Sequence, residues 1–340
     1  YIWHHELLPN WNPTSSNRIL VFGDIHGMLT SLQTLLQKLN YNSNSDTVLL
    51  LGDLAAKHPS IQASLDTIKY CRQSKFEAVR GNHDQYIIVW RNWMVDHRNS
   101  FVTNQEIKNY KLNHQASLEL DLWLQTHQPS SKLKHKLPKG MKWKSQHFEI
   151  ARRLPKVDFE WMLSKSLTLY LHPLRMFFVH AGMLPWSLPN DLTKSSDSNL
   201  KQNKDSLLSL KENNDPYTLL EMRGLKKGRE PTKNAKKGKP WYKVWNKAMS
   251  ACHQTSRQDD GWCQESYHIA YGHWAGKGLT LKSWSTGLDS GCVFGRQLSG
   301  LILGGEQSVN DDQVHQFQIK IHQQNVTIAQ ISCPEPSSHH

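Results

Sequence analysis

One stretch of the chain, Arg18-Ile-Leu-Val-Phe-Gly-Asp-Ile-His-Gly27, decides the fold. Its apolar run from Ile19 to Phe22 is typical of a buried β-strand, which the following glycine ends. Asp24 and His26 come directly after this strand and lie two residues apart. Because alternate side chains of an extended segment point the same way, the carboxylate and the imidazole are directed to one place. The stretch therefore predicts a strand that ends in two metal ligands.

Two further strand-like runs end in the same way. Residues 47–51 lead into Gly52-Asp53-Leu54, and residues 76–79 lead into Arg80-Gly81-Asn82-His83-Asp84. Helical segments over roughly residues 30–39 and 61–74 separate the three runs, and this order predicts a parallel α/β sheet. Ligands bind such sheets beyond the carboxyl ends of the strands. Each motif alone could be an ordinary turn or helix cap, but three in succession predict one shared site.

These motifs resemble the signature of the calcineurin-like metallophosphoesterases. Val179-His180-Ala181-Gly182 and Tyr271-Gly272-His273 complete that signature, so the resemblance covers nearly the whole chain. The later segment Gly287-Leu-Asp-Ser-Gly-Cys-Val-Phe-Gly295 is similar to the ApaH-like branch, which includes diadenosine-tetraphosphate hydrolases and fungal zinc-dependent endopolyphosphatases. We place the chain closest to the endopolyphosphatases. The resemblance implies an α/β fold, a calcineurin-like two-sheet β-sandwich flanked by helices and carrying helical and loop insertions.

The same resemblance implies two divalent metal ions, with zinc, manganese and cobalt as the candidates. Asp24, His26 and Asp53 are expected to hold one ion. Asp53 is expected to bridge to the second ion, whose other ligands are Asn82, His180 and His273. Carboxylate, imidazole and amide oxygen ligands suit such ions. Two cations that share a carboxylate bind phosphoryl oxygens and activate a water for attack on phosphorus.

The resemblance also implies groups that act on the substrate. His83 is the candidate general acid, since an imidazole near neutrality can give up a proton to the leaving oxygen. Arg80 and Arg223 are expected to grip phosphate, because a guanidinium makes paired contacts to phosphate oxygens. Asp84 is a candidate partner of His83, although the sequence leaves open what orients that histidine.

The loop after the second strand, Gly52-Asp-Leu-Ala-Ala-Lys-His-Pro59, departs from the protein Ser/Thr phosphatases. Their loop carries a second Asp that orients the catalytic His, whereas Ala56 and Lys57 stand there in this chain. This difference argues against a protein phosphatase. We expect Lys57 and His58 to bind a phosphate beyond the scissile one.

The chain is long enough to bury a sizeable core, and we expect a single domain over residues 1–340. We expect an extended N-terminal arm over residues 1–17, a helical cap insertion over 85–165, and a basic loop insertion over 187–262, of which 190–215 is a polar loop. Strands are predicted at 167–171 and 174–179. From residue 267 to the end, alternating apolar residues predict antiparallel strands of a second sheet.

The formal net charge is +12 and the pI is about 9.4, which favours a polyanionic substrate. Residues 221–240 are the most cationic part: Arg223, Lys226, Lys227, Arg229, Lys233, Lys236, Lys237 and Lys239. We interpret this segment as an arm for phosphate chains, with Lys226 and Lys227 as substrate contacts; a solvated loop is the alternative.

Three functions fit these observations. An endopolyphosphatase, which cleaves inorganic polyphosphate, is our main interpretation, because affinity for a long polyanion grows with each phosphate neutralised. A dinucleoside-polyphosphate or mRNA-cap hydrolase is the alternative, and it needs aromatic rings for base stacking. Five tryptophans could supply them or could simply pack in the core: Trp241, Trp245, Trp262, Trp274 and Trp284. The third hypothesis is an inactive polyanion-binding protein. We do not expect nucleic acid as a partner.

Cysteine usage bears on the compartment. The chain has five cysteines and no Cys-x-x-Cys pair, so thiolate metal sites are not expected. Cys252 and Cys263 could form a disulfide or remain free thiols. With the glycosylation sequon Asn325-Val-Thr327, they favour a vacuolar lumen, with the cytoplasm as the alternative. No apolar run is long enough for a membrane span. The absence of an initial Met indicates a trimmed sequence, and His339-His340 could be tag remnants.

Overall fold

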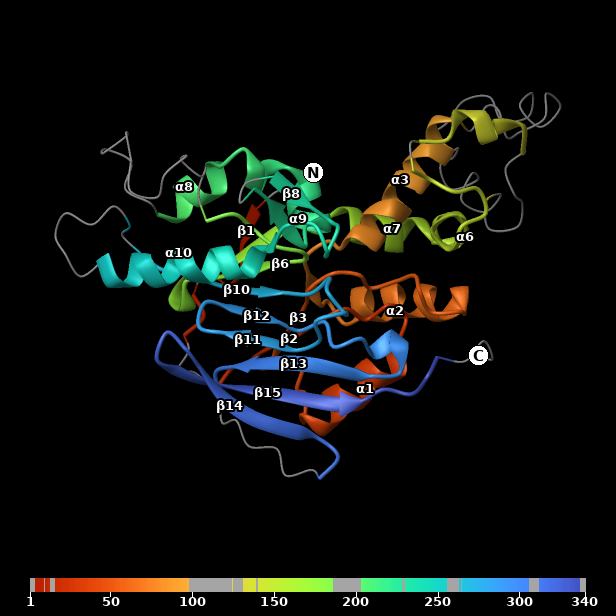
Figure 1. Cartoon of the computed structure of the whole chain (residues 1–340). Helices are drawn as coiled ribbons and strands as arrows, with labels where there is room; N and C mark the ends of the chain where they lie inside the picture. The colour runs from red at the N-terminus through yellow and green to blue at the C-terminus, as the bar shows by residue number, and fades with distance from the viewer. Residues whose placement is uncertain are drawn as a thin grey trace.

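The computed structural model describes residues 4–8, 10–12, 16–97, 124, 131–138, 140–185, 203–227, 230–255, 263, 265–305 and 312–336. In this part of the chain two six-stranded sheets pack face to face, with helices on their outer faces (Figure 1). The predicted α/β sandwich is thus confirmed. No helix in the described ranges is long and apolar enough to cross a membrane.

The first sheet has the strand order β14-β15-β13-β2-β3-β4. Its parallel half consists of β2 (Ile19–Phe22), β3 (Thr47–Leu50) and β4 (Glu77–Ala78), which confirms the three strands expected before the site motifs. Helices α1 (Leu29–Lys38) and α2 (Ile61–Gln73) connect them. Both faces of β2 are buried, which explains its unbroken apolar sequence.

We expected antiparallel strands of a second sheet from residue 267 to the end, but the last three strands of that range extend the first sheet. These are β13 (Gln297–Leu303), β14 (His315–Ile321) and β15 (Gln324–Ser332). β13 pairs antiparallel with β2, with Leu301 opposite Val21. Periodicity predicts a strand and its buried face, but it does not identify the neighbouring strand, and this is why the assignment to a sheet was wrong.

The second sheet has the order β1-β5-β6-β10-β12-β11. Its members are β1 (His4–Glu6), β5 (Thr168–Leu171), β6 (Met176–Val179), β10 (His268–Tyr271), β11 (Thr280–Lys282) and β12 (Ser285–Gly287). β6 and β10 are parallel neighbours, so their carboxyl ends lie side by side. The described part of the N-terminal arm adds β1 to the edge, parallel to β5. A 3₁₀ turn, η3 (His172–Leu174), joins β5 to β6.

The core between the sheets is made by one face of each. Val21 and Leu49 of the first sheet and Leu169, Phe178 and Ala270 of the second belong to one buried apolar cluster. The other face of the first sheet packs against α1 through residues such as Phe22 and Leu32. Apolar burial on both faces fixes the sheet in place, and with it the strand ends that carry the site motifs.

The expected helical insertion forms a lobe of its own, at the upper right of Figure 1. It consists of α3 (Asn82–Asp96), η2 (Ser131–Lys136), α6 (Gln146–Arg153) and α7 (Lys156–Leu163). Trp90, Phe148 and Met162 belong to its apolar cluster. Arg91, buried beneath it, donates to the carbonyl of Ala151 over 2.9 Å. These contacts hold α6 against α3.

The basic segment is more regular than the expected loop. Residues 203–255 contain α8 (Lys204–Ser209), η4 (Glu212–Asn214), α9 (Pro216–Glu221) and α10 (Trp241–Thr255). A small sheet of order β8-β7-β9 is formed by β7 (Gly224–Lys226), β8 (Glu230–Thr232) and β9 (Lys239–Pro240). The polar loop predicted over 190–215 is wrong from residue 203 onward, because Asn203 and Asp215 cap helices. Residues 186–202 lie outside the described part.

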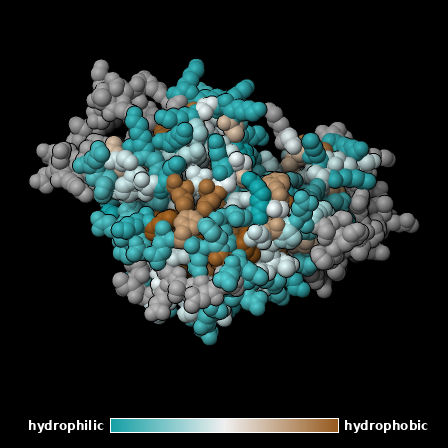
Figure 2. Space-filling view, turned by 60° about the horizontal axis from the view of Figure 1, so that its bottom comes forward, coloured by the Kyte–Doolittle hydropathy of each residue, from teal (hydrophilic) through white to brown (hydrophobic). Residues whose placement is uncertain are grey.

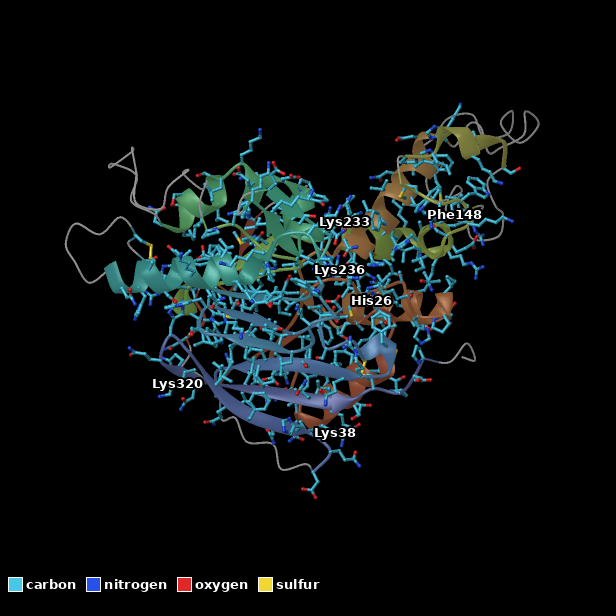
Figure 3. All side chains as sticks on the ribbon, viewed as in Figure 1. His26, Lys38, Phe148, Lys233, Lys236 and Lys320 are labelled. Carbon is cyan, nitrogen blue, oxygen red and sulfur yellow. A yellow bond between two sulfur atoms is a disulfide. The ribbon has the colours of Figure 1, made fainter. Side chains whose placement is uncertain are left out.

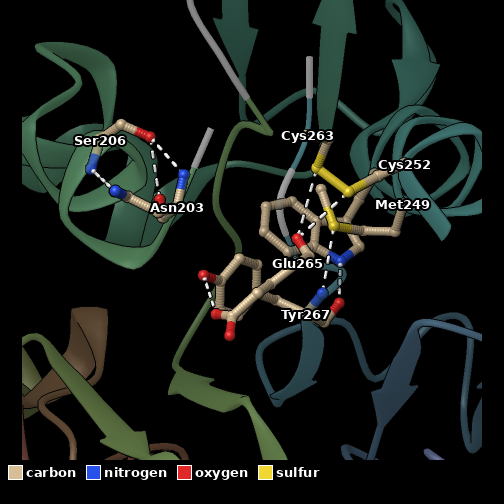
Figure 4. The surroundings of a disulfide bond; sticks show 8 residues. Asn203, Ser206, Met249, Cys252, Cys263, Glu265 and Tyr267 are labelled. Carbon is tan, nitrogen blue, oxygen red and sulfur yellow. Dashed lines mark hydrogen bonds between the residues drawn. A yellow bond between two sulfur atoms is a disulfide. The ribbon is translucent and has the colours of Figure 1, made fainter. Parts of the chain in front are cut away.

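Two disulfides staple the described chain. Cys252 near the end of α10 bonds to Cys263, which resolves the alternative left open by the sequence (Figure 4). Beside this bond, the backbone N–H of Tyr267 donates to the sulfur of Met249 over 3.3 Å. The second disulfide joins Cys292 to Cys333, 41 residues away, a pairing the sequence analysis missed. It ties the 3₁₀ turn η5 (Cys292–Phe294) to the end of β15.

The face shown in Figure 2 is largely hydrophilic, with one small hydrophobic area near its middle.

Candidate metal centre and active site

Six buried side chains converge where strands of both sheets end. Asp24 and His26 follow β2, Asp53 follows β3, Asn82 begins α3 after β4, His180 follows β6, and His273 follows β10. Each is at most 7% exposed. The structure therefore brings together all six residues that the sequence analysis named as metal ligands.

The first group consists of Asp24, His26 and Asp53. The Nε2 atom of His26 lies 3.6 Å from Oδ2 of Asp24 and 3.5 Å from Oδ2 of Asp53. All three side chains direct one ligand atom to a common point, as a metal site requires.

The second group shares Asp53 with the first. The Nε2 atom of His180 lies 3.4 Å from Oδ2 of Asp53, 3.0 Å from Oδ1 of Asn82 and 3.1 Å from Nδ1 of His273. The same carboxylate oxygen of Asp53 thus faces both groups. This is the geometry of a bridging ligand between two cations.

The outward nitrogen of each histidine faces a backbone carbonyl. Nδ1 of His26 lies 3.1 Å from the oxygen of Ala55, and Nδ1 of His180 lies 2.7 Å from that of Leu51. Nε2 of His273 lies 3.2 Å from that of Glu221. A ring that donates its N–H to a carbonyl presents the lone pair of its other nitrogen inward.

The centre is therefore a cluster of acceptors. Among the described residues, Oδ2 of Asp24 and Oδ2 of Asp53 are buried and receive no hydrogen bond. Buried carboxylate oxygens and imidazole lone pairs this close together repel one another unless a cation lies between them. These residues fit divalent metal ions, and bound ions would offset the charge of the two carboxylates.

The electrostatics of the cluster agree with this interpretation. Burial raises the pKa of Asp24 well above its usual value, and the neighbouring Asp289 raises it further. Burial alone would lower the pKa of His180, but Asp53 outweighs it and raises that pKa to about 9. The cluster thus attracts positive charge.

The backbone is strained at the same place. Asp53, His26 and His273 have φ values of 52°, 49° and 68°, in the left-handed region that side chains other than glycine rarely adopt. Ala56 and Lys57 follow in the same conformation, at 68° and 64°. Such strain costs about 1–3 kcal/mol per residue and gathers at functional sites, where surrounding contacts enforce it.

Glycine lets two of the loops approach closely. A Cβ atom on Gly272 would lie 2.2 Å from Oδ1 of Asp24, the oxygen that accepts the N–H of His273 over 2.8 Å. A Cβ atom on Gly81 would lie 2.1 Å from the backbone nitrogen of Asp53. Any side chain at either position would push a ligand loop out of place.

His83 lies beside the centre and has a partner that the sequence analysis missed. Its backbone N–H donates to Oδ1 of Asp53 over 2.8 Å. Its Nδ1 lies 2.8 Å from Nε2 of His147, and the two rings are stacked with centroids 4.9 Å apart. Burial lowers the pKa of His83 to about 2, and burial also lowers that of His147. Nothing in the sequence marks His147, because its relation to His83 arises only when α6 packs on α3.

The residue before His147 reaches the site as well. Oε1 of Gln146 accepts the backbone N–H of Lys57 over 2.6 Å, and its amide nitrogen donates to the carbonyl of His58. Two consecutive residues of the helical insertion thus hold the Lys57 loop and the ring of His83.

Asp84 is not positioned to act on His83 or on substrate. Its buried carboxylate accepts the backbone N–H groups of Asp53 and Gly81, each over 2.9 Å, and that of Leu54 over 3.0 Å. We correct its assignment from catalytic residue to positioning residue, because three backbone donors already occupy it and fix the turn that carries Asp53.

Two other predicted substrate contacts point into the protein. The buried guanidinium of Arg80 donates to the carbonyls of Leu163 and Lys165 over 2.7 and 3.0 Å and to Oε1 of Gln85 over 2.9 Å. It braces α7 against the site loops and is withdrawn from our phosphate-binding set. The buried ring of His58 accepts the N–H of Ser60 over 3.0 Å, which assigns it to loop structure.

The remaining predicted cations differ in their closeness to the centre. Arg223 donates to the carbonyl of His273 over 3.2 Å and to that of Lys233 over 3.4 Å, so its guanidinium lies beside a candidate ligand. The Nζ atom of Lys57 lies 2.9 Å from Nε2 of His26. Lys226 and Lys227 are exposed at the end of β7, and no described contact joins them to the centre.

The tryptophans considered for base stacking are core residues. Trp241 and Trp245 of α10 lie in the same buried apolar cluster as Trp274 and Trp284. Trp262 lies outside the described residues. The buried rings are unavailable to a nucleobase, so the packing alternative is correct for these four.

The site described above is the candidate metal centre of a hydrolase, with two groups of ligands that share Asp53. Residues 17–275 match the family model of the calcineurin-like phosphoesterases, and the chain belongs to this family of metal-dependent hydrolases.

Its relatives include tetraphosphatases. The chain is 24% identical over 308 residues to the symmetrical bis(5'-nucleosyl)-tetraphosphatase of Haemophilus ducreyi, covering 82% of this chain and 93% of that protein. It is 26% identical over 298 residues to the enzyme of that name from Marinomonas sp., covering 84% and 94%. A solved structure provisionally described as a diadenosine tetraphosphatase has a TM-score of 0.50, at 20% identity and 89% and 94% coverage, and supports the fold alone.

Proposed function

We propose that this protein hydrolyses a phosphoanhydride bond of a dinucleoside polyphosphate, with diadenosine tetraphosphate as the representative substrate. The observation that carries the proposal is the six-residue acceptor cluster with Asp53 facing both of its halves. The names of the two full-length relatives supply the substrate class. This reverses our preference from the sequence, where inorganic polyphosphate came first.

Two bound divalent ions, for which zinc, manganese and cobalt are our candidates, would supply Lewis-acid chemistry at the phosphoryl group and lower the pKa of the attacking water. Asp24, His26 and Asp53 would hold one ion, and Asp53, Asn82, His180 and His273 the other. Arg223 and Lys57 would bind phosphate oxygens on either side of the scissile bond. The oxygen of a water molecule bonds to phosphorus as the bridging P–O bond breaks, the proton lost by the water passes to solvent, and the leaving phosphate takes up a proton at its former bridging oxygen.

We assign the donation of that proton to His83. Its surroundings oppose the imidazolium in the free protein, and the negative charge of a bound phosphate chain favours it. His147 would fix the ring of His83, because Nε2 of His147 faces Nδ1 of His83. Nε2 of His83 would then point to the leaving oxygen. His147 would thus take the orienting role of the second Asp of the protein Ser/Thr phosphatases, in whose place this chain has Ala56 and Lys57.

The test is product analysis. The metal-loaded protein is incubated with diadenosine tetraphosphate, with zinc, manganese and cobalt in separate reactions, and the products are separated by ion-exchange chromatography. Symmetrical cleavage gives ADP alone, whereas asymmetrical cleavage gives ATP and AMP. An intact dinucleotide under all three metals, beside a cleaved phosphate polymer, would contradict the proposal.

Inorganic polyphosphate stays as a second candidate because of the basic small sheet. Lys233, Lys236, Lys237 and Lys239 are all exposed, and the backbone of Lys233 is linked through Arg223 to His273. In Figure 3, Lys233 and Lys236 lie on one side of His26, while Lys38 and Lys320 lie on the other. The four lysines Lys233, Lys236, Lys237 and Lys239 could bind successive phosphates of a long chain that leads away from the centre.

For the compartment we propose an oxidising lumen, the vacuole being our candidate. Two disulfides in the described chain support it, since such bonds persist in oxidising surroundings. The sequon residue Asn325 is exposed near the start of β15, where an enzyme could reach it. Mass spectrometry of the protein from its native source, before and after glycosidase treatment, tests this proposal.

A further inference from the structure

The most exposed large hydrophobic side chain in the described part of the protein is Phe294, at 56%. Single apolar residues on a surface are ordinary and need no explanation by themselves. The position of this ring is what distinguishes it, because a cation connects it to the metal centre.

That cation is Lys57. Its Nζ atom lies 5.8 Å from the centroid of the Phe294 ring and 2.9 Å from Nε2 of His26, a candidate metal ligand. One lysine therefore spans the distance from the centre to the ring. In Figure 3 the labelled His26 lies next to the short blue helical turn η5, which carries Phe294.

The turn that carries the ring is held in place by its backbone and by a disulfide. Gly291 and Gly295 adopt left-handed conformations on either side of η5, with φ values of 77° and 68°. The N–H of Phe294 donates to the carbonyl of Gly291 over 2.9 Å. The neighbouring Cys292 is bonded to Cys333, which ties the turn to β15. A side chain presented on a fixed turn loses little freedom when a ligand binds to it.

We propose that Phe294 and Lys57 form a nucleoside-phosphate subsite, in which the Phe294 ring stacks on the base and the Lys57 ammonium binds the adjoining phosphate. The inference rests on the proposed function, and it names the part of the protein that recognises the nucleoside. It also supplies the aromatic surface that the buried tryptophans cannot.

The chemistry of the two residues fits such a ligand. Every nucleobase has a π-face, so stacking on an aromatic ring tolerates different bases. When His26 is engaged with a cation, its nitrogen is no longer a partner for the Lys57 ammonium, which can then pair with phosphate. Because the ring makes no hydrogen bond to base edges, the subsite accepts adenine and guanine alike. Inorganic chains have no base and gain nothing from Phe294.

The experiment compares ADP with inorganic pyrophosphate as probes, using isothermal titration calorimetry on the metal-loaded protein. The variants are Phe294→Ala and Phe294→Trp. Val157→Ala, which truncates another exposed apolar side chain on α7, is the matched control. We expect Phe294→Ala to weaken ADP binding about tenfold and to leave pyrophosphate binding unchanged. Phe294→Trp should bind ADP at least as tightly as the wild type.

Other results would overturn the inference. If Phe294→Ala weakens both probes equally, the ring only supports the structure of the site; if it weakens neither, no base stacks there. Turnover separates this inference from the proposed function. If Phe294→Ala cleaves diadenosine tetraphosphate with the KM of the wild type, the proposed function stands and the proposed subsite is refuted. If the wild type cleaves only inorganic phosphate chains but binds ADP through Phe294, the proposed function is refuted and the proposed subsite stands.

Discussion

The Nδ1 atom of His83 lies 2.8 Å from the Nε2 atom of His147, although 64 residues separate them in the chain. His83 lies in the first turn of α3, which follows the first half of the fold, and His147 lies in the first turn of α6 in the inserted lobe. The insertion is therefore part of the active site and not only a cover for it.

Replacing His147 should impair protonation of the leaving group. We expect His147→Ala to slow hydrolysis of a phosphate ester with a poor leaving group by roughly 10–100-fold, because His83 loses the partner that orients it. A p-nitrophenyl ester needs little help from an acid and should be much less affected. Steady-state kinetics over a series of phenyl esters measures this as a steeper dependence on leaving-group pKa.

His315→Gln, at an exposed position on β14, is the control for that series and should behave like the wild type. An equal loss on all esters in His147→Ala would instead indicate a general disturbance of the site.

The bridging position of Asp53 predicts a loss of metal. Asp53→Asn removes the charge that both groups share, so bound metal should fall from two ions to one or fewer per chain. Turnover should fall by more than about a thousandfold. Elemental analysis of the dialysed protein checks the metal content independently of activity. Two ions retained at full activity would contradict the dinuclear centre.

Arg223 predicts a separation of binding from metal retention. Removing its guanidinium should lower kcat/KM by roughly tenfold to a hundredfold, since charge-assisted hydrogen bonds to phosphate are lost. Arg223→Lys keeps the charge but not the paired donors and should lie between wild type and Arg223→Ala. Metal content should be unchanged in both variants. If it falls, the bond from Arg223 to the His273 carbonyl matters more than phosphate binding.

The exposed lysines of the small sheet distinguish the two candidate substrates. Changing Lys233, Lys236, Lys237 and Lys239 together to Gln should raise KM for long phosphate chains if the polymer follows this surface. The effect should shrink for short chains and at high salt. Four exposed lysines elsewhere, Lys69, Lys75, Lys282 and Lys320, provide a control with the same change in charge. If both sets of substitutions raise KM equally, the lysines of the small sheet attract the polymer only through the net charge of the protein.

A buried histidine away from the centre predicts how stability depends on pH. Burial lowers the pKa of His268 to about 3, below the ordinary value of 6.5, and its Nε2 lies 2.9 Å from the Thr286 hydroxyl. At pH values between about 3 and 6.5, His268 is protonated in the unfolded chain but not in the folded one. Stability should therefore fall as pH drops from about 6.5 towards 3, by up to about 1.4 kcal/mol per pH unit.

Urea unfolding at several pH values, with chelator present in every sample, measures this slope. In His268→Gln the slope should be shallower by that amount, whatever the variant's stability at pH 7. An unchanged slope would show that other groups govern acid unfolding.

Local sequence was enough for the strands β2 to β6, and the resemblance to the metallophosphoesterases supplied the six candidate ligands. Buried strands appear in the sequence as apolar runs, and glycine followed by a polar residue marks their ends. Because parallel strands place those ends at one edge, the convergence of Asp24, Asp53 and Asn82 could be predicted without coordinates.

Other features depended on contacts between distant segments. The pairing of β13 with β2, the partnership of His147 with His83, and the exposure of Phe294 beside Lys57 leave no local pattern. The same holds for Asp84 and Arg80, whose charged groups form hydrogen bonds with backbone groups of distant segments.

The sequence by itself thus determined the buried strands that lead to the site and the side chains that stand at their ends, because both follow from backbone periodicity over a few residues. Only the tertiary structure decided which buried polar group satisfies which partner. A carboxylate or guanidinium binds whatever donor or acceptor packing brings within hydrogen-bond distance, and packing is set by the burial of the whole apolar core.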